Sequence, residues 1–317
     1  MSIRILVVGG NGFIGSHVTD TVLADGADVT VFDRAQEQYR GRLRGVRYFQ
    51  GHLADKGAIE EVFQSPPFDA VIHLAGGTSL PGSPLESAEA DIDNLRDSVT
   101  LFQLCATRGV KKVVFISSGG TVYGIPKTLP VAETDPTDPI CSYGVVKLAI
   151  EKYLLSYAHV YGINAVVLRL ANPYGIRQSP VGRQGAVPIF MWKVLHGLPI
   201  TIWGDGSTAR DFVHIADAAR ACALAAGREC SGVFNIGSGQ GLAIGDLVKA
   251  ISGTLGLPAN IVYQPRREFD VPRLVAYSGA TRTRFPQDRQ DRINRTLRSP
   301  SGLSYLPDAI RRAVTRV

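Results

Sequence analysis

Ile3-Arg4-Ile5-Leu6-Val7-Val8 is an almost continuously apolar run, and it leads directly into Gly9-Gly10-Asn11-Gly12-Phe13-Ile14-Gly15. A run so rich in branched apolar residues predicts a strand buried on both faces of a parallel sheet. The spaced glycines predict a tight turn that opens a helix over residues 14–24. A second strand over residues 28–32 ends at Asp33. Strand, glycine loop, helix, strand and terminal acid together are typical of a dinucleotide-binding unit.

Each glycine of this loop has an expected role toward a dinucleotide. Gly9 permits the tight turn, Gly12 lets the backbone approach a pyrophosphate, and Gly15 lets helix and strand pack closely. The start of the helix, at Phe13 and Ile14, offers free N–H groups and a partial positive charge. We therefore expect phosphate groups to bind at this end of the helix.

The acid at the end of the second strand predicts which dinucleotide is bound. Asp33 would accept hydrogen bonds from ribose hydroxyls, and its charge disfavours a 2′-phosphate. This favours NAD over NADP as the cofactor, although the neighbouring Arg34 weakens the preference.

A second pattern, Tyr143-Gly144-Val145-Val146-Lys147, places a tyrosine and a lysine four residues apart. On a helix these side chains lie on the same face. A phenol with a pKa of ~10 is a poor base at neutral pH. A nearby ammonium and a positive nicotinamide favour the phenolate. We expect Tyr143 to move a proton in redox chemistry on an alcohol or ketone, with Lys147 also bonding the nicotinamide ribose.

Nine short motifs follow one another along the chain, namely Gly9-x-x-Gly12-x-x-Gly15, Asp69–Ala75, Asn94, Ser117–Gly124, Tyr143-x3-Lys147, Arg169–Gly175, Gly204-Asp205-Gly206, Arg210–His214 and Asn235-Ile236-Gly237. In this order they resemble the extended short-chain dehydrogenase/reductase family, within it the nucleotide-sugar epimerases and dehydratases. The resemblance spans roughly residues 1–275 and implies an NAD-dependent enzyme. It also implies further cofactor contacts, at Leu53, Leu74, Ala75, Gly76 and Ser117.

The family's third catalytic residue is a serine or threonine four positions before the tyrosine that stands here as Tyr123. That position is Gly119, which has no hydroxyl to donate. Ser118 and Thr121 are the candidate replacements, and a bound water is a third possibility. Residues two apart on an extended chain share a face, so Thr121 is the better candidate if the strand continues.

The same stretch bears on the type of reaction. The family's sugar 4,6-dehydratases carry an aspartate–glutamate pair where this chain has Gly120 and Thr121. The resemblance therefore favours 4-epimerisation of a nucleotide sugar, with UDP as the expected nucleotide, through a transient 4-keto sugar. It is closest to epimerases of bacterial cell-surface polysaccharide pathways, which implies a role in lipopolysaccharide O-antigen precursors. The alternatives are a dehydratase, decarboxylase or reductase of the same family, or a catalytically impaired NAD-binding sensor.

Substrate contacts also follow from the resemblance. Asn172, Arg210 and Arg267 stand at positions expected to bind the pyrophosphate, which suits guanidinium donors. The alternative is that Arg210 and Arg267 form ion pairs at the surface. Smaller polar side chains are expected to line the sugar, namely Thr78, Ser79 and Asn94.

Three histidines, at positions 52, 73 and 214, are considered as ligand-binding residues. His52 follows Gly51 where the family often has an aspartate, so adenine is expected to be held less specifically. His73 and His214 lack carboxylates at metal-ligand spacing. We expect structural roles for both and no metal site.

The fold class expected is α/β, a doubly wound parallel Rossmann sheet with a smaller C-terminal α/β substrate lobe. At 317 residues, 45% of them hydrophobic, the chain is long enough for two unequal cores. The NAD-binding domain is expected over residues 1–172, with 213–240 returning to it. The substrate lobe is expected over 173–212 and 241–317.

Charge and composition limit the partners. The net charge of +6 is concentrated in residues 277–317, which hold nine arginines and three aspartates. Only two aromatic residues, Phe285 and Tyr305, lie among these arginines, too few to form a row of stacking platforms, so a solvated tail is expected rather than a nucleic-acid partner. The four cysteines lack metal spacing, and no segment reaches the ~20 apolar residues of a membrane span. We expect a cytoplasmic homodimer, formed through helices at 91–108 and 143–160, as the resemblance implies.

Overall fold

The computed structural model describes residues 2–64, 66–76, 84–181, 184–267 and 271–276, with the backbone alone at 84–87. The chain forms two interleaved compact units. The first unit comprises Met1–Ser118, Cys141–Arg169 and Ala218–Phe234, and the second comprises Gly119–Ile140, Leu170–Asp217 and Asn235–Val317. The sequence also predicted an interleaved division, with its borders at 172, 212 and 240 instead. The arginine-rich tail lies outside the described residues.

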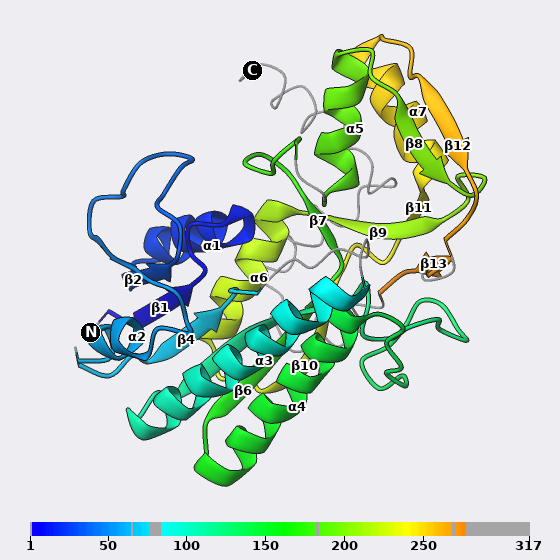
Figure 1. Ribbon diagram of the computed structural model, residues 1–317. Coiled ribbons are helices and arrows are strands. Elements are labelled where there is room, and N and C mark those ends of the chain that lie inside the picture. The colour runs from blue at the N-terminus through cyan, green and yellow to red at the C-terminus, as the bar shows by residue number, and fades with distance from the viewer. Residues whose placement is uncertain (1, 65, 77–83, 182–183, 268–270, 277–317) are drawn as a thin grey trace. The chain divides into compact units, whose positions relative to one another are not determined.

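A seven-stranded sheet forms the centre of the first unit (Figure 1). Its strands are β1 (Arg4–Val8), β2 (Asp28–Asp33), β3 (Val46–Gln50), β4 (Ala70–His73), β5 (Lys112–Ser118), β6 (Asn164–Leu170) and β10 (Gly232–Ile236). Their order is β10-β6-β5-β4-β1-β2-β3, and β1 pairs in parallel with both β2 and β4. The order reverses at β1, which is where doubly wound sheets bind ligands. The predicted fold class is confirmed.

Helices cover this sheet because its central strands β1, β4 and β5 are buried on both faces. The helices are α1 (Phe13–Ala24), α2 (Lys56–Val62), α3 (Pro84–Thr107), α4 (Ser142–Tyr161) and α6 (Ile215–Gly227). Leu6, Val8 and Phe115 belong to one core with α2, α3 and α4, while the alternate residues Ile5 and Val7 are also buried. Figure 1 shows α3 and α4 side by side, and both helices contribute to that core.

The second unit is built from shorter elements. They are β7 (Asn172–Tyr174), α5 (Ala186–Leu195), β8 (Ile200–Trp203), β9 (Ala209–His214), β11 (Gly241–Ala243), α7 (Ile244–Leu255), β12 (Ile261–Gln264) and β13 (Arg273–Leu274). Strands β7, β11 and β13 all pair with β9, and β12 pairs with β8. Helices α5 and α7 pack with β8 around Met191, Ile200 and Leu247.

Asp211 organises the strand β9 and its neighbours. Its buried carboxylate accepts hydrogen bonds from the backbone N–H groups of Ser238, Gly239 and Ala276 and from the Ser238 hydroxyl. Hydrogen bonds from several N–H groups replace much of the hydration that a carboxylate loses on burial. The loop at 238–239 and the segment after β13 are thereby tied to β9.

A buried ion pair holds α4 against the sheet in the first unit. Glu151 and Arg169 are 1% and 4% exposed, and the Arg169 guanidinium donates to both carboxylate oxygens at 2.7–3.2 Å. The Ser117 hydroxyl donates to the same carboxylate. Because removing one partner would leave the other charge buried without compensation, this pair is costly to break.

We expect Glu151→Ala to lower the free energy of unfolding by about 3–5 kcal/mol, because Arg169 would stay buried without its partner. Urea unfolding followed by circular dichroism would measure the change. Lys249→Ala is the matched control, since it opens an exposed pair with Asp246 that should contribute less than about 1 kcal/mol. Equal effects of the two substitutions would contradict the expectation.

Candidate functional site

The glycine loop after β1 is shaped by backbone contacts. Gly9 has φ +83° and donates its N–H to the Phe32 carbonyl at 2.8 Å. A Cβ on Gly9 would lie 2.7 Å from the Ala75 nitrogen, and one on Gly15 would overlap the Gly9 carbonyl oxygen. Both glycines are therefore required by the packing of the loop itself.

Gly12 differs from these two glycines. Its φ of −75° suits any residue, and the nearest atom to an added Cβ is the Gly9 oxygen at 3.5 Å. The protein's own packing therefore leaves room for a side chain at Gly12. Gly12 lines the pocket described below, so a side chain there would occupy space that a ligand can use.

The N-terminus of α1 carries free hydrogen-bond donors. Gly12 is its N-cap, and no side chain caps this end of the helix. The N–H groups of Phe13, Ile14 and Gly15 precede the first intrahelical bond, which runs from Ser16 to Gly12 at 2.8 Å. Such a helix end suits a phosphate group.

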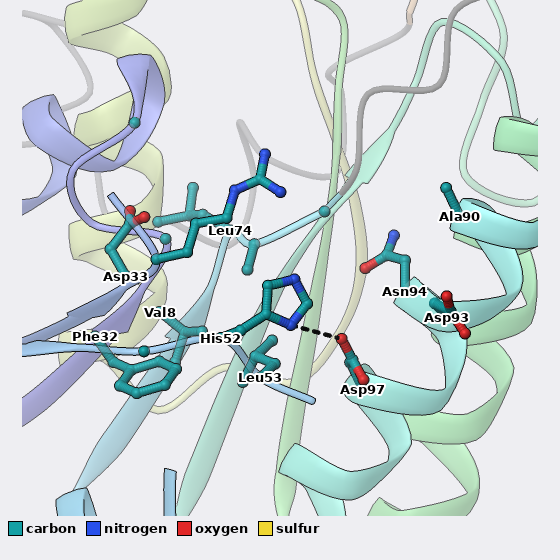
Figure 2. Close-up of a pocket in the computed structure, with 16 residues that line it drawn as sticks. Val8, Phe32, Asp33, His52, Leu53, Leu74, Ala90, Asp93, Asn94 and Asp97 are labelled. Carbon is teal, nitrogen blue, oxygen red and sulfur yellow. Dashed lines mark ion pairs between the residues drawn. The ribbon is translucent and has the colours of Figure 1, made fainter. Parts of the chain in front are cut away.

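A cavity of about 340 Å³ opens at the carboxyl ends of β1 to β4 (Figure 2). Nine of its lining residues were predicted from the sequence, namely Gly9, Gly12, Asp33, Arg34, Leu53, Leu74, Ala75, Gly76 and Asn94. The other seven are Val8, Phe32, Gly51, His52, Ala90, Asp93 and Asp97. Asn94, predicted on the sugar side, thus shares one pocket with the residues predicted to bind the cofactor.

Asp33 is fixed at the edge of this pocket by the backbone. One carboxylate oxygen accepts the Asn11 N–H and the other accepts the Ala35 N–H, both at 2.9 Å. An ionised carboxylate has about four acceptor sites, so it can still accept hydrogen bonds from ribose hydroxyls. This set, together with the open space at Gly12, fits an adenine dinucleotide that lacks a 2′-phosphate.

Lys147, on α4, lies next to Gly76, which lines this pocket, and Tyr143 stands one turn before Lys147. The Lys147 ammonium is buried, donates to the Ile116 carbonyl at 3.1 Å and lies 5.7 Å from the centre of the Tyr143 ring. A Cβ on Gly76 would lie 3.1 Å from Nζ of Lys147 and 3.4 Å from Nδ2 of Asn94. The end of β4 therefore brings the pocket up to the tyrosine–lysine pair.

Burial shifts the proton affinities of both groups. It raises the pKa of Tyr143 to about 12, and the nearby Asp91 and Cys141 act in the same direction. Burial lowers the pKa of Lys147 to about 8, against the opposing influence of Glu151 and Asp91. Without a bound cation, Tyr143 is therefore a phenol at neutral pH, and only an added positive charge can make it a base.

The candidates for the third catalytic group lie at the end of β5. Ser117 directs its hydroxyl to Glu151. Strand β5 ends at Ser118 and the chain turns over residues 119–123, so the extended geometry that favoured Thr121 is absent. The preference for Thr121 was conditional on a continuing strand, and this condition is not met because the chain turns at Gly119 and Gly120. The Thr121 hydroxyl is buried and, within the described part of the chain, has no hydrogen-bond partner.

Three predicted substrate residues lie in the second unit. Asn172 donates to the Asp211 carbonyl at 3.2 Å, and Arg210 stands on the paired strand β9. The Arg267 guanidinium lies 5.1 Å from the centre of the Trp203 ring. The two other predicted sugar contacts, Thr78 and Ser79, fall outside the described residues.

Of the residues of α3 that line the pocket, only Asn94 was predicted from the sequence, and Ala90, Asp93 and Asp97 were not. Ala90, Asn94 and Asp97 follow one another at helical spacing on one face of α3, and this spacing was the available signal. Asp97 lies 3.7 Å from Nδ1 of His52, as the dashed line in Figure 2 shows. Burial raises the pKa of Asp97.

His73 and His214, the two histidines considered for metal binding, make contacts with a hydroxyl and a backbone N–H group. Nε2 of His73 lies 2.9 Å from the Ser98 hydroxyl, and burial lowers the pKa of His73 to about 3. Nδ1 of His214 accepts the Ala216 N–H at 3.3 Å. Among the described residues, no three metal-binding side chains converge. No described helix is long and apolar enough to cross a membrane.

Known proteins resemble this chain over most of its length. A model of the NAD dependent epimerase/dehydratase family matches residues 5–237. The UDP-glucose 4-epimerase of Halalkalibacterium halodurans is 34% identical over 298 residues, which cover 88% of either chain. The UDP-glucose 4-epimerase of Thermus thermophilus, solved in complex with NAD, is 34% identical with a TM-score of 0.85, covering 99% of this chain and 98% of the other.

A further solved structure extends the comparison to another sugar. The UDP-N-acetylglucosamine 4-epimerase of Methanobrevibacter ruminantium, in complex with UDP-N-acetylmuramic acid, is 28% identical. Its TM-score is 0.84, and the match covers 100% of both chains.

The two glycines Gly12 and Gly15 should respond differently to alanine. We expect Gly12→Ala to change the free energy of unfolding by less than about 1 kcal/mol but to weaken NAD binding at least about tenfold, or about 1.4 kcal/mol. Gly15→Ala should destabilise the cofactor-free protein by more than about 2 kcal/mol, since its Cβ would overlap backbone. Calorimetric titration with NAD and urea unfolding measure the two effects. Undiminished NAD binding by Gly12→Ala would disprove the role given to Gly12.

Proposed function

The chain belongs to the NAD-dependent epimerase/dehydratase family, and we propose that it inverts C4 of a UDP-linked sugar. NAD is the cofactor of this enzyme family. The observation that carries the proposal is the position of Tyr143 and Lys147 beside the dinucleotide pocket. Such a pair can take a proton from a sugar hydroxyl while the carbon beneath it is oxidised.

The reaction needs one redox partner and one proton carrier. When bound, NAD supplies the hydride acceptor and later the hydride donor. Tyr143, as the phenolate that the Lys147 ammonium stabilises, removes the proton of the C4 hydroxyl and becomes a neutral phenol. After the 4-keto sugar has turned its other face toward the nicotinamide, Tyr143 returns the proton to the new C4 oxygen. No net oxidation results.

The choice of a UDP-sugar has two supports. The relatives described above are named for UDP-glucose or UDP-N-acetylglucosamine. The pyrophosphate of such a substrate suits the side chains of Asn172, Arg210 and Arg267. Because the relatives differ in their sugars, the proposal extends to the nucleotide and to C4, not to one hexose.

Three broader proposals accompany this activity. Helices α3 and α4 are proposed as a homodimer interface, because apolar side chains stand exposed on them, namely Ile92, Val145, Tyr153, Val160 and Tyr161. A cytoplasmic location and a role in supplying lipopolysaccharide O-antigen precursors are supported only by the sequence features given above.

Tyr143→Phe should reduce epimerisation by about 10²–10⁴-fold, because the variant has no group to move the proton. Proton NMR of the anomeric region, with UDP-hexoses, UDP-N-acetylhexosamines and UDP-uronic acids as substrates, would follow the C4 epimer without net NAD reduction. Tyr263→Phe is the control, since Tyr263 is exposed on β12 and should leave turnover unchanged. An active Tyr143→Phe variant would exclude this mechanism.

The value of kcat/KM should fall as pH rises through about 8. Burial lowers the pKa of Lys147 to about 8, so the ammonium is lost above that pH and can no longer stabilise a phenolate. The profile is measured between pH 6 and 10, with return to pH 7 as the control for reversible titration. A flat profile up to pH 10 would show that Lys147 keeps its proton, contrary to this expectation.

A further inference from the structure

Asp91 is a buried acid that belongs to none of the predicted motifs. Its side chain stands on α3, is 1% exposed, and accepts a hydrogen bond from the Ser142 hydroxyl at 2.7 Å. Ser142 is the first residue of α4 and directly precedes Tyr143. Because α3 and α4 lie along each other (Figure 1), Asp91 is fixed next to the turn of α4 that carries the proposed catalytic tyrosine.

The second carboxylate oxygen of Asp91 has no evident structural use. It is buried and, within the described part of the chain, has no hydrogen-bond partner. Such an oxygen costs free energy. An asparagine of the same shape could accept the Ser142 hydrogen bond without a charge. The charge of Asp91 therefore calls for a reason other than packing.

Several other titratable groups lie near Tyr143 in the first unit. Cys141 is the N-cap of α4, Lys147 lies on α4, and Glu151 lies one turn beyond Lys147, paired with Arg169. His73, on β4, is held neutral by burial, which lowers its pKa to about 3. The charge of Asp91 raises the pKa of Tyr143 and, together with that of Glu151, the pKa of Lys147. Because Asp91 is buried, its field is little screened by water.

We propose that Asp91 is a positioning residue whose negative charge keeps Tyr143 protonated until the positive nicotinamide binds, and keeps Lys147 charged. This role rests on the proposed function, in which Tyr143 is needed as a base only where the positive nicotinamide is bound. The charge also makes the phenolate, once formed, a stronger base toward the sugar hydroxyl. Burial and Asp91 both raise the pKa of Tyr143, in the direction that this role requires.

The test follows tyrosinate absorbance at 295 nm, which needs no substrate. NAD-saturated protein is titrated from pH 6 to 10.5, and the Tyr143→Phe curve is subtracted to isolate Tyr143. In Asp91→Asn the midpoint of Tyr143 should move to lower pH by about one unit. Glu89→Gln, which removes an exposed carboxylate from the same helix, should overlay the wild type. In Asp91→Asn, the pH at which kcat/KM rises on the acid side of its profile should move to lower values together with the titration midpoint of Tyr143.

The proposal would be overturned if the 295 nm titration curves of Asp91→Asn and the wild type coincided. The same holds if neither protein showed a step that depends on Tyr143. Asp91→Ser provides a second neutral variant should the amide disturb folding, and Asp91→Glu should restore the wild-type midpoint. A protein that shows the shift but epimerises no UDP-sugar would refute the proposed function and leave the role of Asp91 standing. The two failures are thereby distinguishable.

Discussion

The site depends on one close approach of backbone to backbone, between the end of β1 and the end of β4. Gly9 turns with φ +83° against the backbone of Ala75, and a methyl group there would lie 2.7 Å from the Ala75 nitrogen. The same glycine donates to the Phe32 carbonyl of β2. Three strand ends are thereby held together, and the pocket opens between them. Its place follows from the topology, because the strand order reverses at β1.

Burial of charge is the second constraint, and it serves chemistry more than stability. Lys147 and Glu151 stand one turn apart on the buried face of α4, and each is met by β5, through Ile116 and Ser117 respectively. Such groups lose hydration and are weak sources of stability. In return, their proton affinities respond strongly to a cation placed nearby. Burial raises the pKa of Tyr143, and a positive nicotinamide beside the ring would lower it again.

The regular elements were predictable because their signals are local. The apolar run before Gly9, the helical spacing of Tyr143 and Lys147 and the acid at the end of β2 can all be recognised within a few residues of sequence. Whether the strand continues to Thr121 is less local, and the strand pattern did not reveal the turn over residues 119–123. Asp91 and Asp97 escaped notice because acids on a helix are usually solvated, and only tertiary packing buries them.

From the sequence alone one can derive the parallel sheet, the dinucleotide loop, the tyrosine–lysine pair and the preference for NAD, because each depends on residue type and spacing along one chain segment. Only the tertiary structure decides which face of α3 lines the pocket, that Gly12 has room for a side chain while Gly15 has none, and that Asp91 lies beside Tyr143. These facts depend on distances between segments far apart in the chain. Burial and electric field at a side chain are set by such neighbours, and no local pattern records them.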